Sequence, residues 1–157
     1  MLVGGRVNSF ASSRVFRGTV SSTEKDVTWK ELEPMRNARR EHITFKMKEN
    51  LYVVGGYGRY LLDISLHYRD NILSSCERFD MVKNKWFTCQ HSLPYPLCDA
   101  SVIVSDDETF AVITGGRKEN HKLSDGCITF TEDGGFKHSK TYSLLSPRWR
   151  HVSIRTY

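Results

Sequence analysis

Residues 51–56 read Leu-Tyr-Val-Val-Gly-Gly, a short apolar run that ends in two glycines. The same arrangement occurs at residues 1–5, Met-Leu-Val-Gly-Gly, and at residues 110–116, Phe-Ala-Val-Ile-Thr-Gly-Gly. The first glycines of the three pairs are 51 and 60 residues apart. Recurrence at about this spacing indicates a solenoid or a propeller, so the fold is best interpreted from this repeat.

Each double glycine is followed by a polar loop and then by two further segments with strand-like alternation. In the middle copy these segments contain Phe79 and Trp86, and Trp29 takes the tryptophan position in the first copy. The third copy has Phe136 there instead. A loop rich in proline or arginine then leads to another β-prone stretch and to the next double glycine. Alternation with a period of two, with Pro and Gly confined to the joints, predicts a four-stranded antiparallel unit.

Two recurrent residue types have a physical explanation in such a unit. A strand that leads towards the crowded centre of a propeller must turn beside neighbouring backbones, and glycine permits both the turn and the close approach. The recurrent tryptophan offers a large apolar surface that can fill the gap between one sheet and the next.

These residues resemble the kelch repeat, which combines a double glycine with a downstream aromatic residue, a tryptophan and a Pro-x-x-Arg loop. The resemblance implies an all-β fold, an incomplete kelch β-propeller of four-stranded antiparallel blades, with about two and a half to three blades. We expect one partial propeller over residues 1–157, with repeat remnants at 1–34, 35–93 and 94–146 and the start of another at 147–157. The structural positions of the motif are Gly4, Gly5, Trp29, Gly55, Gly56, Phe79, Trp86, Gly115 and Gly116.

Propellers usually close with about four to eight blades, because a partial ring leaves a blade face and a sheet edge exposed. We therefore expect the chain to be a fragment, or one part of a ring that self-association with other copies completes.

Composition limits the compartment and the partners. The net charge is +5, but basic residues are scattered among acidic ones along the chain, which argues against a nucleic-acid partner. No apolar run approaches the roughly 20 residues that cross a bilayer, and the N-terminus does not read as a secretory signal, so we expect a cytoplasmic protein without a membrane partner. The four cysteines have no C-x-x-C spacing and are expected to be buried free thiols, with a disulfide or a zinc site as alternatives.

Among kelch proteins the chain most resembles the BTB-kelch type. The resemblance implies a protein-interaction scaffold, either the substrate-recognition part of a cullin-RING ubiquitin ligase adaptor or an actin-binding cytoskeletal protein. A partner would meet the loops that follow the double glycines and those that precede each blade. Arginine and tyrosine suit such contacts, because the guanidinium group binds a carboxylate in two places. The candidate partner-binding residues in these loops are Arg6, Arg39, Arg40, Tyr57, Arg59, Arg117, Arg148 and Arg150.

The sequence gives no support for catalysis, and we expect neither an enzyme nor a cofactor. His42 and His151 occupy equivalent places in two repeats, but equivalent places in separate blades lie far apart, so a structural role is expected rather than a metal site. A metal-dependent oxidase on the same fold is the less favoured alternative, and bound copper, iron or cobalt in the purified protein would support it.

Overall fold

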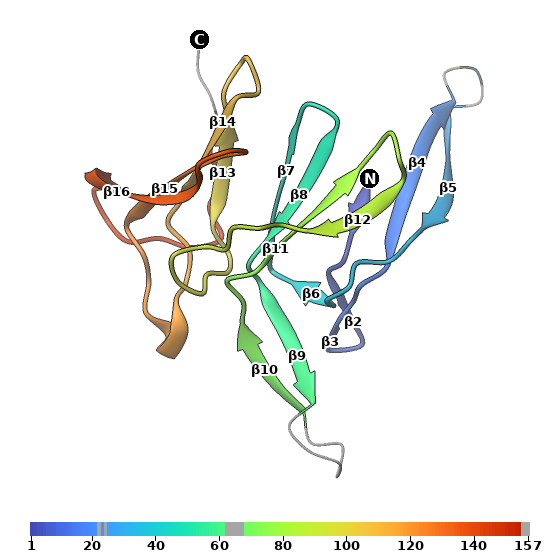
Figure 1. The fold of residues 1–157 in the computed structure, drawn as a ribbon. Coiled ribbons are helices and arrows are strands. Elements are labelled where there is room, and N and C mark those ends of the chain that lie inside the picture. The colour runs from blue at the N-terminus through green and yellow to red at the C-terminus, as the bar shows by residue number, and fades with distance from the viewer. Residues whose placement is uncertain (22, 24, 62–67, 155–157) are drawn as a thin grey trace.

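The computed structural model describes residues 1–21, 23, 25–61 and 68–154, and its regular structure is almost entirely β. The strands form separate sheets that stand side by side like the ribs of a fan (Figure 1). Within the described residues the single helix is one 3-10 turn, η1 (Glu119–His121), and none is long and apolar enough to cross a membrane. The expected all-β fold is confirmed.

Two of the sheets are complete four-stranded antiparallel blades. Blade 2 has the order β7-β8-β11-β12, and blade 3 has the order β13-β14-β15-β16. In both, the strands follow one another in sequence order, as the repeat predicted. Their bounds are β7 (Ile43–Met47), β8 (Asn50–Val54), β11 (Cys76–Asp80), β12 (Lys85–Thr88), β13 (Ser101–Val104), β14 (Phe110–Thr114), β15 (Gly126–Thr131) and β16 (Gly135–Ser143).

Blade 1 consists of three strands, in the order β1-β4-β5. These are β1 (Leu2–Val3), β4 (Val15–Ser21) and β5 (Asp26–Leu32). Beyond blade 3, the backbone N–H of Ser153 donates a hydrogen bond to Ser101 Oγ over 2.7 Å, so this segment lies beside the first strand of that blade. The architecture is the partial propeller of four-stranded units that the repeat predicted.

Short hairpins extend from the loops that follow the double glycines. In blade 1 this hairpin is β2 (Arg6–Val7) with β3 (Phe10–Ala11). In blade 2 it is β9 (Tyr57–Leu61) with β10 (Tyr68–Ile72), and β6 (Arg39–Arg40) adds a third strand to it. The hairpins project on the same side of the fan in Figure 1. The long segment after Gly56 thus contains a β-extension, and its residues 62–67 lie outside the described residues.

The core lies between neighbouring blades. Ile43, Phe45 and Met47 of β7 are buried while the alternate residues are exposed, which is the period of two expected for a half-buried strand. Across the gap between blades 2 and 3, Phe45 and Tyr52 pack against Phe130, with ring centroids 5.6 and 4.9 Å apart. Apolar packing between blades, rather than contacts within one blade, therefore holds the sheets together.

The double glycines join each blade to the loop that enters the next. The second glycine of each pair donates its N–H to a carbonyl oxygen of that loop: Gly5 to Arg39 over 2.9 Å, Gly56 to Leu97 over 2.9 Å, and Gly116 to Arg148 over 2.8 Å. Gly55 has a φ of 63°, and a Cβ there would lie 2.2 Å from the Leu97 oxygen. A positive φ and close backbone approach both require glycine, as the sequence predicted.

The two motif tryptophans differ in their surroundings. Trp86 is buried against Phe79, with ring centroids 5.2 Å apart, and its Nε1–H donates to Glu33 O over 2.8 Å. This contact links blade 2 to the loop that leaves blade 1, so the gap-filling role is confirmed for Trp86. Trp29 is 52% exposed and lies over Gly18 of its own blade, so among the described residues it fills no such gap.

Candidate functional site

The loops that enter successive blades meet through an unusual backbone arrangement. Glu41, Asp99 and Arg150 occupy the same place in three repeats, and all three have left-handed backbone angles, with φ of 56°, 54° and 51°. Asp99 N–H donates to Glu41 O and Arg150 N–H donates to Asp99 O, each over 2.9 Å. This chain of hydrogen bonds holds three non-glycine residues in a sparsely populated conformation, which is typical of functional sites.

Around this backbone chain lie five side chains that we call the arginine cluster: Arg40, Tyr57, Arg117, Trp149 and Arg150. The Arg40 guanidinium lies 4.5 Å from the centre of the Tyr57 ring. The Arg117 guanidinium lies 5.4 Å from the Tyr57 ring and 4.8 Å from the Trp149 ring, and Arg150 lies 4.6 Å from Trp149. Cation–π contacts at these distances fix the guanidinium planes.

Two carboxylates orient the three guanidinium groups. Arg117 Nη2 lies 3.0 Å from Asp99 Oδ2 and 3.2 Å from Glu41 Oε2. Arg150 Nε lies 3.2 Å from Asp99 Oδ1, and Arg40 Nη1 lies 2.5 Å from Glu41 Oε1. Because three cations meet two anions, the group carries one net positive charge. The Arg150 side chain is 58% exposed while that of Asp99 is 5% exposed, so the positive charge faces solvent.

The same place offers three potential metal ligands, since single ligand atoms of Glu41, Cys98 and Asp99 lie within 4.8 Å of one another. Both carboxylates are already paired with arginine. Burial raises the pKa of the Cys98 thiol to about 11, which keeps it protonated and a poor ligand. The donor set therefore fits an ion-pair network better than a metal centre.

The structure brings together four of the eight residues that the sequence singled out: Arg40, Tyr57, Arg117 and Arg150. Arg6 is exposed on the neighbouring hairpin, and Arg148 is exposed with its Nη2 bonded to Ser146 Oγ over 2.9 Å. Arg59 pairs with Asp70 along the β9–β10 backbone, but its side chain lies outside what the structure describes.

The structure contradicts the prediction that Arg39 contacts a partner. Its side chain is fully buried and its donors are all used within the protein, by Glu77 Oε1, Gly55 O, Ser75 O and Ser75 Oγ at 2.9–3.3 Å. A guanidinium with no exposed surface and no spare donor cannot meet a partner. Arg39 therefore supports the loop that presents Arg40 and is not part of the surface.

Sequence reasoning missed Trp149, Glu41 and Asp99. Trp149 lies between two arginines that were singled out, and its place beside them was the available signal. Superposition of the repeats would also have placed Glu41, Asp99 and Arg150 at one position with opposite charges. Only the three-dimensional arrangement shows that these charges meet.

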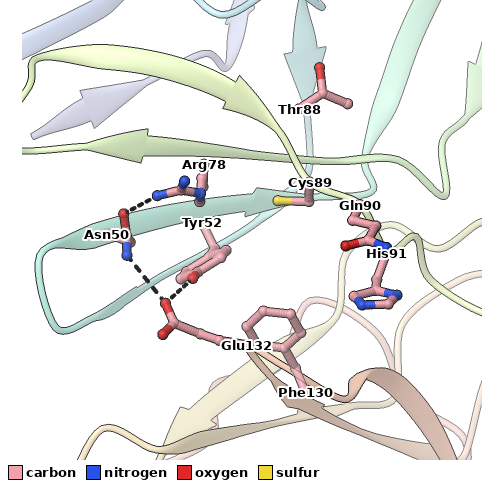
Figure 2. A pocket seen from close by; sticks show the side chains of 9 residues that line it. All are labelled: Asn50, Tyr52, Arg78, Thr88, Cys89, Gln90, His91, Phe130 and Glu132. Carbon is pink, nitrogen blue, oxygen red and sulfur yellow. Dashed lines mark hydrogen bonds between the residues drawn. The ribbon is translucent and has the colours of Figure 1, made fainter.

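A separate cavity of about 440 Å³ lies between blades 2 and 3, and Figure 2 shows the residues that line it. On one wall, Arg78 Nη1 donates to Asn50 Oδ1 over 2.7 Å, and Asn50 Nδ2 donates to Glu132 Oε1 over 3.2 Å. The Tyr52 hydroxyl donates to the same carboxylate oxygen. Cys89 and His91 line another part of the cavity. These side chains were not singled out from the sequence.

Comparison with known proteins agrees with this architecture. The profile of the Kelch motif family matches residues 47–90, which contain β8, β11 and β12 of blade 2 and the last residue of β7. The solved structure of YjhT, one of 129 matching chains, superposes on 90% of this chain with a TM-score of 0.66 and 14% sequence identity. No curated protein sequence matches the chain.

The similarity to YjhT shows the fold alone, because the sequence identity is low. The superposition covers 52% of the YjhT chain, so this chain spans about half of that structure's length. The protein thus carries a Kelch motif and has the fold of part of a kelch-type propeller.

Proposed function

We propose that the protein is an interaction scaffold that binds an acidic segment of a partner protein through the arginine cluster. The observation that carries the proposal is the convergence of the largely buried Arg117 and the exposed Arg150 on the Trp149 ring and on the buried Asp99 carboxylate. Both carboxylates of this arrangement are paired with arginine and burial raises the pKa of the Cys98 thiol, so we expect binding without turnover.

The chemistry of the cluster supports this proposal. Kelch repeats generally mediate protein–protein contacts, and Arg, Tyr and Trp are the residue types enriched at interaction hot spots. Glu41 and Asp99 hold the guanidinium groups in place before a partner arrives, which lowers the entropy lost on binding. The left-over positive charge favours an acidic ligand over a neutral one.

Fluorescence anisotropy with a labelled glutamate-rich peptide tests the proposal. We expect Arg150→Ala to weaken binding by about tenfold or more, because removal of a hot-spot side chain costs at least about 1.4 kcal/mol. Arg14→Ala is the matched control. The Arg14 side chain is 59% exposed and that of Arg150 is 58% exposed, and each is paired with a glutamate. Equal binding of a glutamine-rich peptide, or equal effects of the two variants, would refute the proposal.

The partner defines the cellular role. Our first proposal is the substrate-recognition part of a cytoplasmic cullin-RING ubiquitin ligase adaptor, as the BTB-kelch resemblance suggests. In that case, a protein bound through the cluster should lose ubiquitin conjugation in cells when Arg117 and Arg150 are replaced by alanine.

Actin binding is the alternative and has a separate readout. Co-sedimentation with actin filaments that persists at high salt would favour it over the adaptor, because binding driven by exposed charges weakens as salt screens them.

A further inference from the structure

Two cysteines face each other across the outer hairpin of blade 2. Cys76 is the first residue of β11, and Cys89 directly follows β12. The N–H of Cys89 donates to the carbonyl oxygen of Cys76 over 3.0 Å, which makes them a directly opposed antiparallel pair. Such hydrogen-bonded pairs have Cα atoms about 5.5 Å apart, within the range that a disulfide spans.

The sulfur atoms are already in contact. Cys76 Sγ donates to Cys89 Sγ over 2.7 Å, and a disulfide bond needs about 2.05 Å. All four cysteines of the chain are free thiols, so this pair is in its reduced form. The two sulfurs therefore lie close to bonding distance.

The two thiols have different environments. Cys76 is 1% exposed, whereas Cys89 is partly exposed and lines the cavity between blades 2 and 3, beside His91 and Gln90 (Figure 2). The hydrogen bond from Cys76 lowers the pKa of Cys89, and the positive charge of Arg78 acts in the same direction. The same hydrogen bond and burial raise the pKa of Cys76. Cys89 is therefore the better nucleophile, and Cys76 is placed to follow it.

We propose that Cys76 and Cys89 are a peroxide-reactive dithiol site that closes to a reversible cross-strand disulfide. The oxidant is hydrogen peroxide that enters the 440 Å³ cavity, which is far larger than the roughly 30 Å³ that one water molecule occupies. This site is separate from the arginine cluster and does not depend on the proposed function.

The reaction proceeds in two balanced steps. The Cys89 thiolate attacks one peroxide oxygen, the O–O bond breaks, and the products are a sulfenic acid on Cys89 and a hydroxide that takes a proton to leave as water. The Cys76 sulfur then attacks the Cys89 sulfur, the S–O bond breaks, and the departing oxygen leaves as water with the Cys76 proton. The peroxide gains the two electrons that the thiols lose.

The disulfide would restrain Glu77, the residue that holds the loop before β7. Glu77 directly follows Cys76 and accepts the backbone N–H groups of Arg36 and Asn37 over 2.8 and 3.1 Å. A disulfide would link the start of β11 to the end of β12 and would restrain the Glu77 carboxylate, which lies at the start of β11. The link thus lies next to the residue that positions the loop before Arg40.

Peptide mapping of the intact protein tests the proposal. The folded protein is exposed to hydrogen peroxide, its remaining thiols are alkylated, and it is digested without reductant for mass spectrometry. We expect a Cys76–Cys89 cross-link that dithiothreitol reverses, while Cys98 and Cys127 are recovered alkylated. Random pairing, oxidation of all four cysteines at equal rates, or recovery of Cys76 and Cys89 as free thiols would overturn it.

Variants separate the order of events from a general effect on folding. Cys76→Ser should leave a sulfenic acid on Cys89 that dimedone traps, and Cys89→Ser should abolish both the cross-link and the trapped adduct. Cys127→Ser is the matched control and should behave like the parent protein. Circular dichroism identifies a variant that fails to fold. In that case the rate of alkylation in the parent protein tests which thiol reacts first, and Cys89 should react several-fold faster than Cys98.

Discussion

The two junctions between blades share one backbone design but use opposite side-chain chemistry. At the first junction, Arg39 and Glu77 form an ion pair over 3.0 Å, with side-chain exposures of 0% and 1%. At the second, Leu97 and Ile128 take the equivalent places and lie together in the buried apolar cluster. In both, the loop carbonyl accepts the N–H of the second glycine over 2.9 Å.

The difference shows that the repeat conserves a backbone contact and a buried volume rather than a particular residue pair. A buried ion pair needs every donor and acceptor satisfied, and Arg39 achieves this through carbonyl groups of Gly55 and Ser75 as well as Glu77. An apolar pair needs only packing. We therefore expect the first junction to respond more strongly to single substitutions and to pH.

The largest effect is expected from Arg39→Leu. The change leaves Glu77 buried without its countercharge, which should lower the free energy of unfolding by about 3–5 kcal/mol. Urea unfolding followed by tryptophan fluorescence measures it. Arg148→Leu is the matched control at the equivalent position, where the side chain is exposed, and should change stability by less than about 0.5 kcal/mol. Equal losses would mean that burial does not distinguish the two arginines.

At the second junction, Leu97→Ala should cost about 2–5 kcal/mol, because it leaves a cavity in a closely packed cluster. The same urea titration reports the loss. Leu145→Ala, at a fully exposed leucine, should leave the midpoint within error. A Leu97 variant as stable as the parent would show that this junction contributes little to folding.

The pH dependence should also differ between the junctions, because His42 lies in the first and Ala100 takes its place in the second. Burial and the nearby Arg39 charge lower the pKa of His42 from 6.5 to about 4. The unfolded state then binds the proton more tightly, so stability is fully present above pH 6.5 and falls as the pH drops from 6.5 towards 4, by up to roughly 3 kcal/mol.

Thermal unfolding at a series of pH values measures this contribution. His42→Gln should flatten the profile between pH 6.5 and 4, because the titrating group is gone. His151→Gln, at the equivalent place two repeats further on, should keep most of the slope, because the titration of His42 remains. If the His42 variant retained the full slope, carboxylates would account for it.

The smallest effect concerns the interaction between the two charged residues. In a double-mutant cycle, Arg39→Leu with Glu77→Ile imitates the second junction and should cost less than the sum of the single changes by about 0.5–3 kcal/mol. The double variant should still be less stable than the parent, because the N–H groups of Arg36 and Asn37 lose their acceptor. Strict additivity would show that Arg39 and Glu77 do not stabilise each other.

The repeat, the strand alternation and the need for glycine could all be predicted from the sequence alone. These features are local, since each follows from the side chains and backbone freedom of a few consecutive residues. The buried positions of β7 and the left-handed Gly55 are where the pattern placed them. The face that gathers Arg40, Tyr57, Arg117 and Arg150 followed equally from their loops, because loops at equivalent places in a propeller share one side.

Which of several equivalent residues are buried could not be predicted in this way and depends on how the blades pack. Arg39 and Arg148 share a repeat position, as do Trp86 and Trp29, yet in each pair one is buried and the other is exposed. The reason is that burial depends on which residues the adjacent blade supplies, and these are far away in sequence. The meeting of Glu41, Asp99 and Arg150, and the contact of Cys76 with Cys89, likewise exist only once blades and strands are paired.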